Sequence, residues 1–371
     1  MRLLFVARAL HGMAGGVERM IIALMNEMAA RGHEVGLLSW DRADAEAFYP
    51  MAEAVDWHRL DMGDPGRKAG PGLVAARAAR VRRLLKARQP EVIVCFQGGP
   101  FRAMLLYTLG LGIPLVAAER TAPTLYEHAG SARARFIEHQ AFRFATRITI
   151  QFERYRTLYP QHLRERMVTI SNPVAPAATQ ARPGEPGPDR RFRLLSVGRL
   201  SYQKNYGVLL AAFAELAPRF PQWDLRIVGE GEDRAALEAQ LAGLPQLSGR
   251  VALPGATADI GAEYAAAQLF CLPARWEGFP NALAEALAHG LPAVGFAGCA
   301  GVADLIEDGV TGALAAGNND AAALAGALAP LLAADAERDR MGRNAAQSVA
   351  PYRPEAVFDR WEETLRACRP A

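Results

Sequence analysis

Two glutamates set among small and apolar residues are the first candidates for chemistry. The stretch 275–295 reads RWEGFPNALAEALAHGLPAVG and places Glu277 and Glu285 on either side of Pro280. Proline suits the first turn of a helix, where its missing N–H costs no hydrogen bond. Glu277 therefore belongs to the preceding loop, and Glu285 lies about one turn inside the helix. The N–H groups between them predict an anion site flanked by carboxylates, which suits a phosphate carrying two hydroxyl-bearing sugars.

A structural alternative is that Glu285 faces solvent from an Ala-rich helix. The helix lies between the apolar segments 269–274 and 291–297, both of which are typical of buried strands. A charge in such surroundings rarely stays without a partner. The setting therefore favours a functional glutamate over a solvated one.

A pair of cations follows another expected strand in SVGRLSYQKN, residues 196–205. The strand ends near Gly198, and Arg199 and Lys204 come next. Two cations at the carboxyl end of a strand can hold both phosphates of a nucleotide diphosphate and neutralise charge as it departs. Arg and Lys are also common in loops that bind no ligand. This pair is a stronger candidate because it lies in the same half of the chain as the two glutamates.

The sequence HGMAGGVERM, residues 11–20, follows the first expected strand and opens a helix. Gly15 and Gly16 allow the backbone to approach a ligand, and the helix start offers N–H groups to a phosphate or sugar oxygen. The dinucleotide fingerprint Gly-x-Gly-x-x-Gly is absent from this loop. Its nearest counterpart is VGEGEDR at 228–234, whose acidic residues repel pyrophosphate and indicate a structural loop.

Metal and nucleophile chemistry find little support in the sequence. No Asp-x-Asp pair occurs, so no metal or other cofactor is expected, and Arg199 and Lys204 would stand in for a metal. The Ser, His and Cys residues show no triad-like spacing. The four cysteines lie far apart and form no Cys-x-x-Cys, so the sequence indicates neither a zinc site nor a disulfide framework and fits a reducing cytoplasm.

Short apolar strands alternate with amphipathic helices along the whole chain, which predicts an α/β fold with parallel sheets covered by helices. The expected strands are 2–8, 34–40, 91–97, 114–119, 147–152 and 169–173, then 192–200, 223–231, 250–256, 269–274 and 291–297. The Pro- and Gly-rich segment 175–191 is the expected linker. We therefore predict two Rossmann-like domains, 1–174 and 192–350, and a C-terminal helix in 351–371 that packs back towards the first. Ligands would bind at the carboxyl ends of the strands, in a cleft between domains.

The charge is distributed unevenly. Residues 1–172 hold 24 Lys and Arg against 16 Asp and Glu, and residues 173–371 hold 18 against 23. The segment 67–90 carries eight cations and no acid beside an apolar stripe that includes Val81 and Leu85. This pattern is typical of a helix on an anionic membrane surface and equally of a helix packed on its own sheet. No signal peptide is evident, and the apolar run 103–118 is too short and interrupted to span a bilayer.

These motifs together resemble the retaining glycosyltransferases of family four, which have the GT-B fold of two facing Rossmann-like domains. The resemblance covers nearly the whole chain and is carried by GGVER, ISNPV at 170–174, VGRLSYQKN and EGFPNALAE, which matches the Glu-x7-Glu motif of the family. It implies a UDP-sugar donor bound mainly by the C-terminal domain. Glu277 would contact the donor sugar, Glu285 the ribose, and Arg199 and Lys204 the diphosphate. The other positions implied at the nucleotide-sugar site are Gly15, Gly16, Gly198, Gly278, Phe279 and Asn281.

The motif GFPN and the sequence AER at 118–120 look most like transferases that add hexose or N-acetylhexosamine units to lipid-linked oligosaccharides and surface polysaccharides. Many members of the family carry a His after that strand, where this chain has Glu119 and Arg120. Glu119, Arg120 or His11 would then contact the acceptor or the donor sugar. The resemblance also implies transfer with retention of anomeric configuration. Transfer without a metal is expected from the missing Asp-x-Asp pair, and the basic segment 67–90 with the basic first half predicts a cytoplasmic protein at the inner face of the membrane. Nucleic acid is not an expected partner.

Other functions stay open on the sequence alone. A glycoside hydrolase could use Glu277 and Glu285 as acid and base, although this leaves Arg199 and Lys204 unexplained. A nucleotide-sugar epimerase of the same two-domain fold is a further alternative. A nucleotide-sugar-binding protein without catalysis is a third, and a turnover assay distinguishes it from an enzyme.

Overall fold

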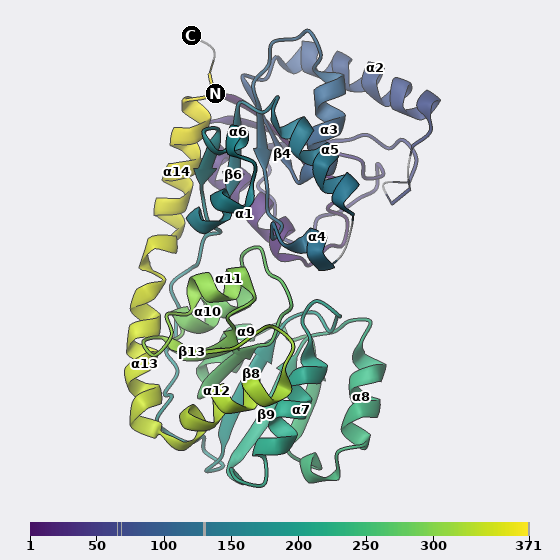
Figure 1. Cartoon of the computed structure of the whole chain (residues 1–371). Coiled ribbons are helices and arrows are strands. Elements are labelled where there is room, and N and C mark those ends of the chain that lie inside the picture. The colour runs from purple at the N-terminus through teal and green to yellow at the C-terminus, as the bar shows by residue number, and fades with distance from the viewer. Residues whose placement is uncertain (65, 68, 129–130, 370–371) are drawn as a thin grey trace. The chain divides into compact units, whose positions relative to one another are not determined.

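The computed structural model describes residues 1–64, 66–67, 69–128 and 131–369. The chain forms two compact units: the first comprises Met1–Pro173 and Glu355–Ala371, and the second comprises Val174–Pro354. Each unit is built on one parallel sheet with helices packed against it (Figure 1). The predicted α/β fold is thus confirmed.

The first unit has seven parallel strands in the order β3-β2-β1-β4-β5-β6-β7. Its central strands β1 and β4 are almost wholly buried, which explains their continuous apolar sequences. The strands are β1 (Arg2–Val6), β2 (Glu34–Ser39), β3 (Val55–Arg59), β4 (Val92–Phe96), β5 (Leu115–Ala118), β6 (Arg147–Ile150) and β7 (Met167–Thr169). The helices are α1 (Gly16–Ala30), α2 (Pro71–Arg88), α3 (Gly98–Tyr107), α4 (Leu125–His128), α5 (Ala132–Phe142), α6 (Gln161–Arg164) and, from the far end of the chain, α14 (Pro354–Arg366).

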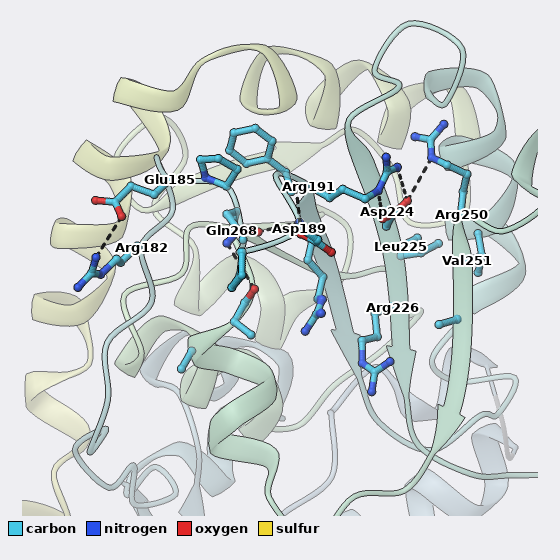
Figure 2. A pocket seen from close by; sticks show the side chains of 18 of the residues that line it. Arg182, Glu185, Asp189, Arg191, Asp224, Leu225, Arg226, Arg250, Val251 and Gln268 are labelled. Carbon is cyan, nitrogen blue, oxygen red and sulfur yellow. Dashed lines mark hydrogen bonds and ion pairs between the residues drawn. The ribbon is translucent and has the colours of Figure 1, made fainter.

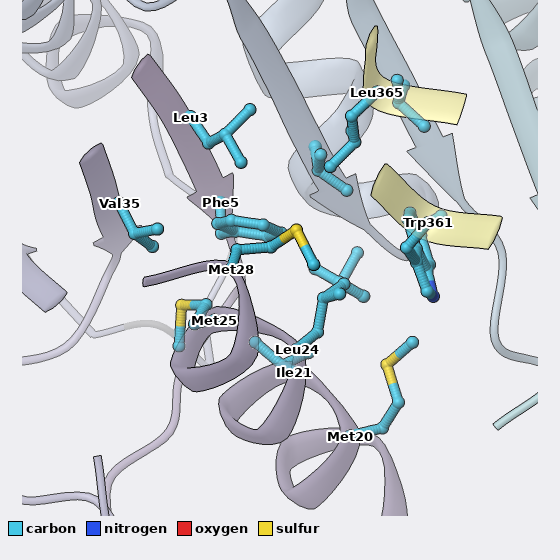
Figure 3. Close-up of a cluster of buried hydrophobic side chains, with 14 of the residues drawn as sticks. Leu3, Phe5, Met20, Ile21, Leu24, Met25, Met28, Val35, Trp361 and Leu365 are labelled. Atoms are coloured by element: carbon cyan, nitrogen blue, oxygen red, sulfur yellow. The ribbon is translucent and has the colours of Figure 1, made fainter. Parts of the chain in front are cut away.

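Helix α14 buries an apolar face against the first unit. Trp361 and Leu365 of α14 belong to the same cluster of buried side chains as Phe5 (Figure 3). The ring centroid of Trp361 lies 6.3 Å from that of Phe96, and Phe96 stacks on Phe5. Beside this face, Arg31, the residue that caps the end of α1, donates to the half-buried Glu362 of α14 at 2.9 Å. This bond, with others from Arg366 and His33, lowers the pKa of Glu362 to about 2. Apolar packing and ion pairs together place residues 355–369 with the first unit.

The second unit has six parallel strands in the order β10-β9-β8-β11-β12-β13. The strands are β8 (Phe192–Val197), β9 (Trp223–Val228), β10 (Val251–Gly255), β11 (Leu269–Leu272), β12 (Ala293–Phe296) and β13 (Gly312–Ala315). The helices are α7 (Tyr206–Leu216), α8 (Arg234–Ala242), α9 (Ile260–Ala265), α10 (Asn281–Ala288), α11 (Ala300–Leu305), α12 (Ala321–Ala333) and α13 (Asp335–Ser348).

The segment expected to be a linker, 175–191, packs on the second unit. Arg338 of α13 is fully buried, and its guanidinium donates to the carbonyls of Pro183, at 2.8 Å, and Leu331, at 2.6 Å. The same guanidinium lies over the rings of Phe192 and Trp223, 4.7 and 4.8 Å from their centroids. Arg338, together with hydrogen bonds from Gln180, Ala181 and Gly184 to the second unit, therefore holds the segment on the core of that unit.

Three strand assignments differ from the sequence analysis. Strand β3 was not expected, because only Val55 of its five residues is fully buried and no apolar run marks it. Strand β13 was not expected either, since GALA is short and built of small residues. The predicted strand 169–173 is wrong in position: β7 is Met167–Thr169, and the chain from Ile170 onward is irregular.

Candidate active site

Two loops of the second unit bring the predicted cation and carboxylate together. Lys204, in the turn before α7, points its ammonium at Glu277, in the loop before α10, with 2.5 Å between Nζ and Oε1. Glu277 is buried, and the lysine side chain is largely so. The sequence analysis assigned separate ligands to these residues, whereas the structure joins them in one ion pair.

Hydrogen bonds between the two loops hold this pair in place. Asn205 adopts a left-handed conformation, with φ of 60°, and its buried side chain donates to the carbonyl of Pro273 at 3.1 Å. The side chain of Gln203 donates to the carbonyl of Trp276 at 2.9 Å, and the backbone carbonyl of Gln203 accepts from the N–H of Arg275 at 2.8 Å. The turn that carries Lys204 is therefore fixed to the chain that carries Glu277.

Gly198 and Arg199 form the other side of the turn after β8. The backbone of Gly198 has φ of 151°, and a Cβ on neighbouring Gly229 would lie 2.0 Å from the Gly198 carbonyl oxygen. Only glycine allows the ends of β8 and β9 to approach so closely, so Gly229 of the VGEG loop has the structural role expected for that loop. Arg199 is exposed and forms no hydrogen bond or ion pair with another residue that the structure describes.

Glu285 lies in the second turn of α10, half-buried, as the sequence predicted. The hydroxyl of Tyr264, a buried residue of α9, donates to its Oε2 at 3.0 Å. His289, at the end of α10, packs against Tyr264 with the rings tilted by 37° and 4.9 Å between their centroids. Tyr264 thus fixes the Glu285 carboxylate, a role that no sequence motif marks.

The remaining predicted positions near α10 divide into two kinds. Asn281 is the first residue of the helix and is half-buried, as is Gly278. Phe279 is buried, and its ring packs edge-on against Tyr352 at 5.5 Å. Its side chain is therefore part of the packing of the second unit, and we assign it no contact with a ligand.

In the first unit, the loop after β1 has the predicted helix start. Gly15 caps α1 and Gly16 is its first residue. The carboxylate of Glu18 folds back over this turn, since a Cβ on Gly15 would lie 2.1 Å from Glu18 Oε2. His11 is exposed, and its Nδ1 accepts from the N–H of Glu46 at 3.1 Å.

The guanidinium of Arg120 is bonded to other residues of the first unit. It donates to the carbonyl of Ile170 at 2.7 Å and to Thr149 Oγ1 at 2.6 Å, and it lies over the ring of Trp361 at 5.1 Å. Burial lowers its pKa to about 9. These contacts join β5, β6 and the chain after β7 to α14, so Arg120 has a structural role in place of the predicted substrate contact.

Glu119 lines a cavity of about 280 Å³ at the carboxyl ends of β4 and β5. Glu138 of α5 lies on the same wall, where Tyr126 donates to its Oε1 at 2.8 Å. A Cβ on Gly98 would lie only 1.7 Å from Glu138 Oε2, so glycine at the start of α3 makes room for this carboxylate. Burial, reinforced by the charge of Glu138, raises the pKa of Glu119 to about 7. The sequence analysis named Glu119 and missed Glu138, which lies in an unremarkable helix.

A larger cavity, of about 640 Å³, lies elsewhere in the second unit (Figure 2). Its walls come from the amino ends of β8, β9 and β10, the edge opposite to the one that carries Gly198 and Lys204. Charged side chains on its wall are already paired, as in the bidentate pair between Arg191 and Asp224 and in the pair between Arg226 and Glu263. Ligands of parallel sheets bind at the carboxyl ends, so we do not assign this cavity to the active site.

Metal ligands do not gather at the site. The structure contains no group of three or more His, Cys, Asp and Glu suited to a metal ion among the residues it describes. Cys299 lies beside Glu277, and burial, together with that carboxylate, raises the pKa of its thiol to about 12. The residues available for chemistry are therefore the Lys204–Glu277 pair, Arg199 and Glu285.

Both units match known protein-family models. Residues 15–173 match the model of the glycosyl transferase 4-like domain, and residues 178–348 match the model of glycosyl transferases group 1. An uncharacterized glycosyltransferase of Haemophilus influenzae is 27% identical over 312 residues, covering 83% of this chain and 84% of its own. The amylovoran biosynthesis glycosyltransferase AmsD of Erwinia amylovora is 30% identical over 176 residues, which are 47% of this chain and 48% of AmsD.

Solved structures share the fold across the whole chain. Anabaena HepE in complex with UDP and glucose superposes with a TM-score of 0.78 at 20% identity, covering 99% of this chain and 100% of HepE. The lipopolysaccharide outer core galactosyltransferase WaaB superposes with a TM-score of 0.77 at 17% identity, covering 99% of each chain. The chain is therefore a glycosyltransferase with a glycosyl transferase 4-like first domain, a glycosyl transferases group 1 second domain and the GT-B fold.

Proposed function

We propose that this glycosyltransferase moves a hexose or N-acetylhexosamine from a UDP-sugar to a lipid-linked or polysaccharide acceptor, with retention and without a metal, in bacterial surface-glycan synthesis. The observation that carries the proposal is the Lys204–Glu277 ion pair beside the amino end of α10, with Glu285 held by Tyr264 in the same helix. HepE has been solved with UDP and with UDP-glucose, and AmsD acts in amylovoran biosynthesis, which supports the donor and acceptor classes.

Each of these residues is assigned to a different part of the UDP-sugar donor. The N–H groups at the start of α10 and the guanidinium of Arg199 attract the diphosphate. Glu285 accepts hydrogen bonds from the ribose hydroxyls, with Tyr264 fixing the direction of its carboxylate. Glu277 accepts from hydroxyls of the donor sugar. The ammonium of Lys204, already beside Glu277, neutralises the charge that develops on the departing phosphate.

The transfer step is a substitution at the anomeric carbon on the face that the diphosphate leaves. The acceptor hydroxyl oxygen forms a bond to that carbon as the bond to the β-phosphate oxygen breaks. The hydroxyl proton passes to the departing diphosphate. Nothing in this step requires a covalent bond to the protein, and Lys204 acts by charge alone.

The acceptor is assigned to the cavity beside Glu119 in the first unit. Its wall offers Tyr126, His139, Glu119 and Glu138, a mixture of aromatic faces and polar groups that suits a sugar. Because its pKa is near 7, Glu119 can hold a proton and donate a hydrogen bond at neutral pH. The acceptor is attached to lipid or growing polysaccharide, so we place the enzyme in the cytoplasm, at the inner face of the membrane.

A UDP-release assay tests this proposal. The full chain is incubated without metal with a panel of UDP-sugars and a lipid extract or oligosaccharide pool as acceptor. We expect UDP release that depends on one UDP-sugar, with a labelled glycan as product. Free sugar as the sole product would instead indicate hydrolysis, and nucleotide binding without any turnover would indicate a binding protein.

A further inference from the structure

Gln97, the residue that joins β4 to α3, has a backbone conformation that is ordinarily reserved for glycine. Its φ is 68° and its ψ is 158°. Steric contacts disfavour this combination for every residue that carries a Cβ. Gln97 is therefore a strained residue at the carboxyl end of a central strand of the first sheet.

Other residues with positive φ show that the strain at Gln97 is of a different kind. Gln89 and Asn205 have ψ of 58° and 35°, which place both in the left-handed helical region, an allowed region of the backbone map. The side chain of Asn205 also donates to the carbonyl of Pro273, which helps to hold its conformation. Gln97 lies outside the left-handed helical region and has no such bond.

The path of the chain from β4 to α3 imposes the conformation of Gln97. Its N–H donates to the carbonyl of Ala118 at 3.0 Å, and its carbonyl accepts from the N–H of Phe101 at 3.3 Å. The first bond continues the pairing of β4 with β5, and the second begins α3. The next residue, Gly98, lies so close to Glu138 that a Cβ on it would be 1.7 Å from Oε2.

This path does not require a glutamine. Glycine adopts the same φ and ψ without strain, and the two residues that follow are already glycines. Gln97 is exposed, and its side chain forms no hydrogen bond with another residue that the structure describes. Its side chain therefore does not offset the strain of its backbone within this part of the chain. Strained residues of this kind cluster at sites that bind ligands.

Gln97 lines the cavity that also contains Glu119 and Glu138. A glutamine amide has two N–H donors and one carbonyl acceptor, whereas an ionised carboxylate only accepts hydrogen bonds. A sugar hydroxyl donates one hydrogen bond and accepts others. An amide and a carboxylate on the same wall can therefore hold one hydroxyl in a fixed direction.

We propose that Gln97 is a specificity-determining residue of this cavity: its side-chain amide donates a hydrogen bond to a hydroxyl of the acceptor sugar, while a carboxylate of the cavity accepts from the same hydroxyl. The inference rests on the proposed function, because it assigns a contact to the acceptor in the cavity beside Glu119. The fixed backbone of Gln97 limits the positions of the amide, which reduces the entropy lost when the acceptor binds.

The competing explanation is that Gln97 only completes the turn. In that case Gln97→Gly removes the strain and leaves transfer to the acceptor unchanged. If Gln97 contacts the acceptor, the same substitution stabilises the protein and weakens its use of the acceptor. The two explanations therefore differ in their effect on activity and agree in their effect on stability.

Kinetics of the full chain test the proposal with Gln97→Gly and Gln97→Ala. UDP release is measured with the UDP-sugar and the oligosaccharide pool that support turnover by wild type, while the concentration of each is varied. We expect the KM for the oligosaccharide pool to rise about fivefold in both variants, as the loss of one hydrogen bond predicts. The KM for the UDP-sugar should stay as in wild type.

Thermal unfolding of the same proteins tests the strain. Gln97→Gly should raise the melting temperature by about 2 °C, because glycine relieves the backbone. Gln97→Ala keeps a Cβ in the same conformation, so it should melt as wild type does. Isothermal titration of UDP, with the same dissociation constant in all three proteins, shows that the variants are folded.

Gln89→Gly and Gln89→Ala are the matched controls. Gln89 is an exposed glutamine of the same unit with a positive φ of 45°, and it follows α2 outside the cavity. Both variants should use the oligosaccharide pool as wild type does. The glycine variant thus shows whether a change of backbone freedom in this unit alters the KM without any contact to the acceptor.

The outcomes separate this inference from the function on which it rests. Turnover by wild type with an unchanged KM for the oligosaccharide pool in Gln97→Gly would overturn the inference alone. So would an equal rise of that KM in the Gln89 variants, or a melting temperature of Gln97→Gly below that of wild type. A wild type that releases no UDP from any UDP-sugar would contradict the proposed function, and the inference with it.

Discussion

The ammonium of Lys204 lies 2.5 Å from the carboxylate of Glu277, although 73 residues separate the two in the chain. The loops that carry them follow β8 and β11, which are neighbours in the second sheet. Each charge of the pair balances the other, and the pair lies beside the amino end of α10. It therefore joins the stability of the second unit to the proposed chemistry.

Replacing Lys204 tests that connection. Lys204→Met leaves the Glu277 carboxylate buried without its cation, so we expect it to lower the free energy of unfolding by about 3 kcal/mol. The sequence analysis assigned Lys204 to the diphosphate alone, and the ion pair gives it a structural role as well. Lys204→Met/Glu277→Gln should recover most of the stability, measured by urea unfolding, yet show no UDP release. Full stability in the single variant, or turnover in the double one, would contradict this account.

Removing the hydroxyl of Tyr264 should weaken nucleotide binding without unfolding the protein. Tyr264→Phe keeps the ring against His289 and removes the hydrogen bond to Glu285. The loss of one such bond corresponds to about 1 kcal/mol, or roughly fivefold in the dissociation constant for UDP. Isothermal titration measures it, and an unchanged dissociation constant would show that Tyr264 does not position Glu285 for the nucleotide.

Glu119 should make the stability of the protein depend on pH in a defined direction. Its pKa is about 7 in the folded state and about 4.5 when unfolded, so the folded state holds more protons between these values. The free energy of unfolding should therefore fall as the pH rises from about 4.5 to about 7. Thermal unfolding over this range should show a shallower fall for Glu119→Gln than for wild type. An identical slope for the two proteins would contradict the assignment.

Arg338 should be needed for the folding of the second unit. Arg338→Leu leaves the buried carbonyls of Pro183 and Leu331 without their donor, and we expect a loss of about 3 kcal/mol in urea unfolding. Arg340→Leu on the same helix is the control, since Arg340 is half-exposed and pairs with Glu337 at the surface. A surface change of this kind should cost no more than about 0.5 kcal/mol. Equal effects of the two substitutions would rule out a special role for Arg338.

The sequence predicted those features of the fold that follow directly from the physical properties of a residue type. Continuous apolar runs predicted the central strands, and Pro280 predicted that Glu277 and Glu285 would lie on a loop and a helix. Strands β3 and β13 escaped prediction because their side chains are half-buried or small, so neither alternation nor an apolar run marks them.

The partners of the site residues could not be predicted, because they come from distant parts of the chain. Tyr264 reaches Glu285 from another helix, and Glu138 reaches the Glu119 cavity only because Gly98 lacks a side chain. Arg120 looked like a substrate contact from its place after a strand, yet it is bonded inside the first unit. The basic helix α2 was ambiguous on the sequence, because its pattern fitted a membrane surface and the sheet of its own domain equally well. Val81 and Leu85, the centre of its apolar stripe, are fully buried against the first unit. Lys68, in the same basic segment, lies outside the described residues. Burial therefore shows which face of the helix is covered.

The central claim is that Glu285 and the residues around it bind the nucleotide of the donor. Isothermal titration of UDP into wild type, Glu285→Ala and Glu215→Ala tests it most directly, since Glu215 is an exposed glutamate on α7 of the same unit. We expect wild type and Glu215→Ala to bind UDP alike without metal, and Glu285→Ala to bind at least tenfold more weakly. Equal affinity in all three proteins, or no binding by wild type, would contradict the claim.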